Sequence, residues 1–176
     1  MFIHDNKIAL RATEPRDIEQ IYLWENDRSL WQVSETISPY SHYQIEQFII
    51  NNVDLFTARQ MRLMICLNNN SKPIGCIDIF DFDPIHQRAA IGILIEESYR
   101  NQGHASSAIT LLIEYLFNTL FLKQVYCFVD ETNNDSLSLF SKLGFVQCGR
   151  RKEWIKTPRG FIDEIELQYI NPKYQQ

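Results

Sequence analysis

The sequence predicts an α+β fold in which helices flank a mixed, mostly antiparallel sheet. Three observations predict it. Apolar residues alternate with polar residues in the middle of the chain, which is typical of strands joined by hairpins. Farther along, apolar residues recur at three- and four-residue spacing, which indicates amphipathic helices. Helix-like and strand-like segments then alternate up to a final pair of strands, so helices are interleaved with the sheet.

The first half of the chain is expected to hold a strand, two helices and three further strands. The strand at 7–12 precedes Glu14 and Pro15, which are typical of the start of a helix. A second helix is expected at 41–51. Polar turns separate the three following strands, which therefore form an antiparallel meander. These strands are expected at 62–67, 73–82 and 87–95.

The second half is expected to run helix, strand, helix and two strands. These segments are 106–120, 125–129, 133–142, 145–154 and 161–170. Gly144 would end the second of these helices as a C-terminal cap. Because no repeat, low-complexity tract or long linker interrupts the chain, we expect a single domain over residues 1–176.

The bulk composition argues against several classes of function. The 176 residues carry a net charge of −5, and a nucleic-acid interface needs clustered Lys and Arg, so we expect no nucleic-acid partner. No apolar run approaches the ~20 residues that a membrane span needs. The N-terminus has no long apolar stretch, so we expect neither a signal peptide nor a membrane partner.

The four cysteines indicate a reducing, cytoplasmic setting. They form no CxxC pair, and no His cluster stands at metal-ligand spacing, so we expect no metal. Three lie in apolar, strand-like runs, which favours buried free thiols. The four are Cys66, Cys76, Cys127 and Cys148.

The most informative motif is Arg100-x-x-Gly103-x-Ala105, which lies between an apolar strand and a long apolar helix. A helix start presents unpaired N–H groups and the positive end of its dipole. Gly103 lets the backbone come close to a ligand. Together these features predict an anion site suited to a pyrophosphate. The loop lacks the Gly-Lys-Ser/Thr of a Walker loop and the three glycines of a dinucleotide fingerprint.

A second motif lies downstream of the first, and the pair is more specific than either motif alone. It consists of Asn133 and the run Phe140-x-Lys142-Leu143-Gly144-Phe145. The pair of motifs resembles the GNAT superfamily of N-acetyltransferases. Leu10-Arg11, Pro73-Ile74-Gly75 and Arg88-Ala89 look closest to the spermidine/diamine N-acetyltransferases, with the ribosomal-protein N-terminal acetyltransferases as near neighbours.

The resemblance implies that the fourth and fifth strands splay apart and that acetyl-CoA lies in the gap. It also implies direct attack by an amine on the thioester in a ternary complex. The acceptor would be a polyamine, a small primary amine or a protein N-terminus, and the resemblance favours a homodimer. The residues implied to bind the coenzyme are Ile93, Leu94, Ile95, Arg100, Asn101, Gln102, Gly103, His104, Ala105, Ser106, Asn133, Phe140 and Lys142.

Two positions depart from the family pattern. Phe140 stands where many relatives carry a Tyr that protonates the departing thiolate, and Ala90 stands where relatives often carry a Glu. Asp78, which interrupts an apolar strand, is our candidate to bind the amine or to receive its proton; its alternative is a solvent-facing carboxylate. Tyr126 is the candidate proton donor, or a core residue. For Glu25 we favour a solvated helix face over a place in the amine pocket.

Two other hypotheses remain open at this point. The departures at Phe140 and Ala90 are also compatible with a catalytically weak module that binds acyl-CoA or a partner. A structural subunit of a larger acetyltransferase is the third possibility.

Overall fold

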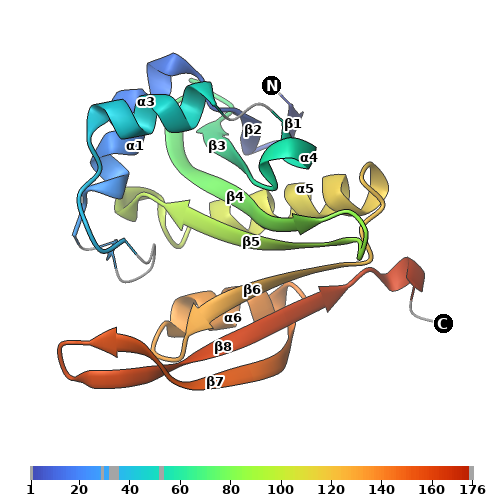
Figure 1. Cartoon of the computed structure of the whole chain (residues 1–176). Coiled ribbons are helices and arrows are strands. Elements are labelled where there is room, and N and C mark those ends of the chain that lie inside the picture. The colour runs from blue at the N-terminus through green and yellow to red at the C-terminus, as the bar shows by residue number, and fades with distance from the viewer. Residues whose placement is uncertain (1, 29, 32–35, 52–53, 175–176) are drawn as a thin grey trace.

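The strands form one eight-stranded sheet in the computed structural model, which describes residues 2–28, 30–31, 36–51 and 54–174 (Figure 1). The order across the sheet is β1-β2-β3-β4-β5-β6-β8-β7. Neighbours are antiparallel except β5 and β6, which are parallel. The strands are β1 (Ile3–His4), β2 (Ile8–Ala12), β3 (Met61–Leu67), β4 (Pro73–Asp83), β5 (Arg88–Ile95), β6 (Gln124–Asp130), β7 (Val146–Thr157) and β8 (Gly160–Ile170).

Helices cover both faces of this sheet. Alternate residues of a strand point to opposite faces, so neighbouring residues of one strand pack against different helices. Met64 of β3 packs in the cluster that holds α1 and α3, whereas the next residue, Ile65, packs in the cluster that holds α5 and α6. The helices are α1 (Ile18–Glu25), α3 (His42–Ile50), α4 (Leu55–Ala58), α5 (His104–Asn118) and α6 (Asn134–Lys142), with short 3-10 turns at Pro15–Asp17, Glu97–Tyr99 and Pro172–Tyr174.

The predicted α+β class and the mostly antiparallel sheet are confirmed. β1, α4 and the 3-10 turns were not expected, because segments of two to four residues are too short to show a periodicity. α5 begins at His104 rather than at 106, since Gly103 adopts the left-handed φ of 84° and the helix starts directly after it. Gly144 has a φ of 93°, as the predicted C-terminal cap requires.

The two parallel strands in the centre of the sheet pair over a short length only. Residues 88–90 of β5 lie opposite residues 124–126 of β6, and no later pair of these strands is in register among the described residues. Figure 1 shows β6 running away from β5 beyond that point. The splayed strands that the resemblance implied are therefore present.

A buried ion pair fixes the start of α1 against the sheet. Both carboxylate oxygens of Asp17 accept hydrogen bonds from Arg11 of β2, at 2.6 and 2.7 Å, and one also accepts from the Glu14 N–H at 2.8 Å. Burial would raise the pKa of Asp17, but these donors outweigh it and hold the pKa below its ordinary value. The pair thus anchors the N-terminal end of the helix whose last residue is Glu25.

Close backbone approach explains the glycine near the start of β4. A Cβ on Gly75 would lie 2.1 Å from the Leu94 carbonyl oxygen of β5, and a backbone atom cannot move aside without bending the strand. We expect Gly75→Ala to lower the free energy of unfolding by about 1–3 kcal/mol, the usual cost of overpacking. Urea denaturation followed by circular dichroism measures this change.

Gly92→Ala is the matched control for that substitution. Gly92 lies in β5, next to the strand that holds Gly75. A Cβ on Gly92 would lie 3.5 Å from the Phe80 side chain, which is an ordinary contact. Alanine also restricts the unfolded chain more than glycine does, so the stability of this variant should stay within ~1 kcal/mol of the parent. Equal midpoints for the parent and Gly75→Ala would contradict the argument.

Candidate functional site

Two cavities lie on either side of the central strand β5. The first, the α5 cleft, has a volume of about 440 Å³ and lies between the end of β5, the start of α5 and the start of α6. The second, the α3 pocket, has a volume of about 380 Å³ and lies between α1, α3 and the sheet. Ile93 and Leu94 line both cavities, so the two meet at this part of β5.

The structure brings most of the predicted coenzyme residues together in the α5 cleft. Those that line it are Ile93, Leu94, Ile95, Arg100, Asn101, Gly103, His104, Ala105, Ser106 and Asn133. Gln102, Phe140 and Lys142 do not line either cavity described here, and for these residues the expected contact with the coenzyme stays a prediction. Gln102 and Lys142 are exposed, and Phe140 is 3% exposed and packs against Phe145 in the core.

The first turn of α5 forms one end of the cleft. Helix N-terminal N–H groups have no partners within their own helix, and over a helix of 15 residues the aligned peptide dipoles add a positive end. Gly103 and Asn101 both have left-handed φ values, 84° and 60°, which turn the loop toward the helix start. This geometry fits an anionic group, as the motif predicted.

His104 gives the cleft an unpaired polar atom. The side chain is 9% exposed, and its Nδ1 is buried without a hydrogen-bond partner among the described residues. Burial and the neighbouring charge of Lys7 lower the pKa of His104, so the imidazole is neutral at pH 7. A buried polar atom without a partner is costly unless a ligand or a water satisfies it.

Two lysines near the loop were missed by the sequence analysis. The Lys7 ammonium lies 3.4 Å from the place where a Cβ of Gly103 would be. Lys72 donates a hydrogen bond to the Tyr99 hydroxyl at 2.9 Å, next to the same loop. Lys7 directly precedes β2 and Lys72 directly precedes β4, so no local spacing in the sequence connects either lysine with Gly103.

The N–H and C=O groups of alternate β5 residues face the gap between β5 and β6. Glu96 N–H donates to the Ile74 carbonyl of β4 at 2.9 Å, so the even-numbered residues of β5 direct their N–H and C=O groups to β4. Ile93 and Ile95 therefore direct theirs to the side from which β6 has turned away. The Ile95 carbonyl accepts a hydrogen bond from Arg100 Nε at 3.0 Å, which closes the loop.

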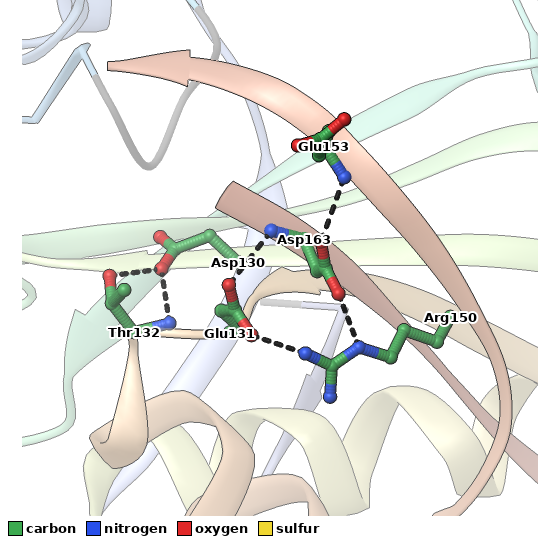
Figure 2. Close-up of polar contacts among 6 residues, drawn as sticks. All are labelled: Asp130, Glu131, Thr132, Arg150, Glu153 and Asp163. Atoms are coloured by element: carbon green, nitrogen blue, oxygen red, sulfur yellow. Dashed lines mark hydrogen bonds and ion pairs between the residues drawn. The ribbon is translucent and has the colours of Figure 1, made fainter. Parts of the chain in front are cut away.

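A polar network holds the opposite side of the cleft, where β6 passes into α6 (Figure 2). Asp130 lines the cleft and accepts hydrogen bonds from the N–H and the hydroxyl of Thr132, at 2.9 and 2.6 Å. Glu131 and Asp163 both bind Arg150 of β7. The network therefore ties the wall of the cleft to the β7–β8 hairpin.

An ion-paired triad lies in the α3 pocket. Arg62 of β3 donates to both oxygens of Asp78 on β4, at 2.7 and 2.8 Å, and to Glu25 of α1 at 2.5 Å. The Arg62 and Glu25 side chains are each 16% exposed and Asp78 is 29% exposed. Burial alone would lower the pKa of Arg62, but the charges of Asp78 and Glu25 hold it well above its ordinary value.

These contacts correct the expectation for Glu25, remove the alternative for Asp78 and limit the prediction for Tyr126. Glu25 does not lie on a solvated helix face, and Asp78 is not a solvent-facing carboxylate, because both line the pocket and bind Arg62. Tyr126 lines neither cavity described here; it is half-buried and its ring contacts Phe128. Its position therefore gives no support to its expected role as proton donor.

A signal for part of the triad was present in the sequence. Arg62 and Asp78 are equidistant from the polar turn between β3 and β4, and they are register partners. However, the register shifts between Ile65 and Cys66, so counting outward from the pair that closes the turn would have missed this partner by one residue. Glu25 offered no such signal, because its place depends on how α1 packs on the sheet.

With this geometry established, the chain can be compared with known proteins. The profile of the acetyltransferase (GNAT) domain family matches residues 7–146, most of the chain. The chain belongs to the GNAT acetyltransferase family. It is therefore an acyltransferase whose acetyl donor is acetyl-CoA.

Relatives and solved structures agree with this assignment. Spermidine N(1)-acetyltransferase of Escherichia coli is 24% identical over 140 residues, 80% of this chain and 73% of that protein. The SPbeta prophage-derived uncharacterized N-acetyltransferase YokL of Bacillus subtilis is 26% identical over 158 residues, 90% of this chain and 86% of that protein. The crystal structure of spermidine N-acetyltransferase from Vibrio cholerae in complex with CoA and spermine shares the fold, with a TM-score of 0.87, 22% identity and coverage of 98% and 100%.

The described parts of the chain fit this donor. The helix start, the Lys7 ammonium and the orphaned His104 nitrogen suit its phosphates, and the backbone of Ile93 suits the amide-bearing arm that joins the phosphates to the thioester. Within the described ranges, no group of three or more His, Cys, Asp or Glu side chains could hold a metal ion. Among the same residues, no helix has both the length and the apolar character needed to cross a bilayer.

The position of Lys7 leads to a prediction. We expect Lys7→Gln to raise the KM for acetyl-CoA about threefold at low salt, with kcat little changed, because one exposed charge contact is worth less than ~1 kcal/mol. The effect should shrink as ionic strength rises. Steady-state kinetics at two salt concentrations measure both changes.

Lys173→Gln is the control, since it removes the same charge where Lys173 binds Asn118 at the opposite end of α5. Equal KM values for the two variants would mean that Lys7 makes no contact with the coenzyme.

Proposed function

We propose that residues 1–176 act as one N-acetyltransferase domain that moves the acetyl group of acetyl-CoA to a primary amine by direct attack in a ternary complex. The observation that supports this most strongly is the meeting of the two cavities at Ile93 and Leu94. A donor held in the α5 cleft and an amine held in the α3 pocket approach each other only there. The same place has backbone groups that face the gap, which suit an oxyanion.

The reaction balances without a metal or an acyl-enzyme. The amine nitrogen forms a bond to the thioester carbon, the C–S bond breaks, and its electron pair leaves with the coenzyme sulfur. The nitrogen loses one proton and the thiolate gains one. An alkylammonium has a pKa of about 10.4, so reaching the neutral amine at pH 7 costs roughly 4–5 kcal/mol.

We expect the protein side chains to do little of the proton chemistry themselves. Ala90 and Phe140 are buried and have no titratable group. Asp78 and Glu25 each keep lone pairs beyond those that Arg62 uses, so they are suited to holding the ammonium in place. We assign both proton transfers to water. Because the coenzyme thiolate is a good leaving group, its protonation needs little assistance from the protein.

Cys76 is the side chain that an acyl-enzyme route would require. It lines the α3 pocket, but it is 3% exposed, and burial raises the pKa of its thiol to about 12. The thiolate, which is the nucleophile, is thus scarce at neutral pH. This favours direct attack over a covalent intermediate.

The acceptor, assembly and location remain proposals. The names of relatives in two bacterial genera specify spermidine, which supports a small amine acceptor for this chain. A solved relative is described as dodecameric, so self-association is a reasonable expectation here, and a homodimer is the simplest form of it. Three of the four free cysteines are buried and Cys148 is exposed, which suits the reducing cytoplasm that we predict.

A thiol-release assay tests the proposed function. With acetyl-CoA and a panel of primary amines, we expect CoA to be released at turnover numbers of about 1–10³ s⁻¹, the usual range for enzymes. Omission of the amine is the control. Acetyl-CoA binding without release across the whole panel would favour the catalytically weak binding module, which the departures at Ala90 and Phe140 also suggest.

The direct route predicts a second pair of results. Initial-velocity plots should give intersecting lines rather than the parallel lines of a ping-pong mechanism. The intact mass of the protein should stay unchanged after incubation with acetyl-CoA in the absence of amine. An added acetyl group that disappears when amine is supplied would overturn the direct route.

A further inference from the structure

The β7–β8 hairpin carries an exposed aromatic side chain close to the α3 pocket. Trp154 of β7 is 60% exposed. Large apolar side chains left in solvent beside a cavity are typical of binding sites. Resting on the function proposed above, we infer that Trp154 binds the acceptor outside the α3 pocket, and that the acceptor amine carries a flat apolar group that packs on the Trp154 ring.

A stack of three side chains joins Trp154 to the pocket. Phe128 of β6 lines the α3 pocket, and the Arg151 guanidinium lies 4.3 Å from the centre of its ring. The same guanidinium lies 5.2 Å from the centre of the Trp154 ring. The buried carboxylate of Glu164 on β8 accepts a hydrogen bond from Arg151 at 2.8 Å. Because ring faces attract guanidinium groups, Arg151 holds the two rings on the same face of the sheet.

A bulge in β7 turns Trp154 toward this face. In a regular strand, residues three apart point to opposite faces, so Trp154 would point away from Arg151. Between Arg151 and Ile155, however, the register with β8 shifts, and Glu153 has a left-handed φ of 51°. The bulge thereby returns Trp154 to the side of Arg151.

Polar contacts hold this bulge in place (Figure 2). The Glu153 N–H donates to one oxygen of Asp163 at 2.7 Å, and the other oxygen binds Arg150. A left-handed φ at a residue other than glycine is strained, and it persists where the surrounding contacts impose it. Here the strained backbone leaves a large ring mostly in solvent, so packing of the core does not account for it. Bulges often re-aim a side chain next to an active site, which is the role that we give to this one.

The walls of the α3 pocket suit the same kind of acceptor. The described residues that line it include four aromatic rings, those of Tyr40, Phe48, Phe80 and Phe128. Aromatic groups pack favourably against one another in offset and edge-to-face arrangements. The carboxylates of the triad would hold the amine inside the pocket, and the flat part of the acceptor would extend past Phe128 to Trp154.

A matched pair of amines tests the inference on the unaltered protein. 4-Phenylbutylamine and 1-aminobutane share a four-carbon chain and differ only in the terminal phenyl group. With saturating acetyl-CoA at pH 7, we expect kcat/KM for the phenyl compound to exceed that for 1-aminobutane by at least about tenfold, a discrimination that apolar contacts readily achieve.

Variants at Trp154 test the residue. Trp154→Ala should lower kcat/KM for 4-phenylbutylamine at least about fivefold, because the phenyl group loses its aromatic partner. The value for 1-aminobutane, which is too short to leave the pocket, should not change. Trp154→Phe keeps an aromatic ring at this position and should retain most of the preference.

Phe161→Ala is the matched control for Trp154→Ala. Phe161 is 59% exposed on the same hairpin. It lies three residues from Glu164 in β8, so it points to the opposite face of the sheet. Its removal should leave the preference for the phenyl compound unchanged.

The other outcomes overturn the inference at different levels. Equal values for the two amines, or equal losses for both in Trp154→Ala, would leave the acetyltransferase function standing without this role for Trp154. A loss with spermidine as large as that with the phenyl compound would assign the ring to a charged group instead. A smaller particle on gel filtration for Trp154→Ala, with unchanged kinetics, would assign Trp154 to a contact between copies of the chain. No thiol release with any amine, in a protein that acetyl-CoA stabilises against heat, would overturn the function as well.

Discussion

The loss of pairing between β5 and β6 is the constraint on which the rest of the site depends. Two parallel strands that separate after the pair Ala90–Tyr126 leave backbone groups of β5 without a neighbouring strand. Unpaired backbone groups are costly when they are buried, so a sheet tolerates such a break where a ligand or water completes it. The crossover between the two strands is α5, whose N-terminus is thereby placed at the open end of the gap. The same break thus provides both the open strand edge and the exposed helix start that we propose for the coenzyme.

In the function that we propose, β5 also places the two substrates on different sides of the sheet. Its even-numbered residues direct their side chains to the face covered by α1 and α3, and its odd-numbered residues direct theirs to the face covered by α5. The triad of Glu25, Arg62 and Asp78 joins one helix to two strands on the first face. Half-buried ion pairs of this kind add little net stability, but removing one partner is expensive. The triad therefore fixes where α1 lies more than it strengthens the fold.

The sequence predicted what periodicity and turn chemistry encode. The long helix at 104–118, the meander and the cap at Gly144 follow from local patterns, and the anion loop follows from one glycine between a strand and a helix. Residues that meet through tertiary packing were not predicted. Lys7, directly before β2, reaches Gly103 because α5 packs against β2, and Phe140 of α6 packs inward against Phe145. The resemblance had suggested that Phe140 contacts the coenzyme, and its burial beside Phe145 lends that prediction no support.

The triad also affects the chemistry of the amine. An apolar wall favours the neutral, nucleophilic amine, whereas each nearby carboxylate favours the unreactive ammonium. Two free carboxylates would bind a cation tightly and hold it in the wrong protonation state, which lowers KM without lowering the barrier to transfer. Arg62 offsets one of the two carboxylate charges that the described lining residues contribute. Because neither Ala90 nor Phe140 has a titratable group, the proposed reaction relies on water to remove the proton.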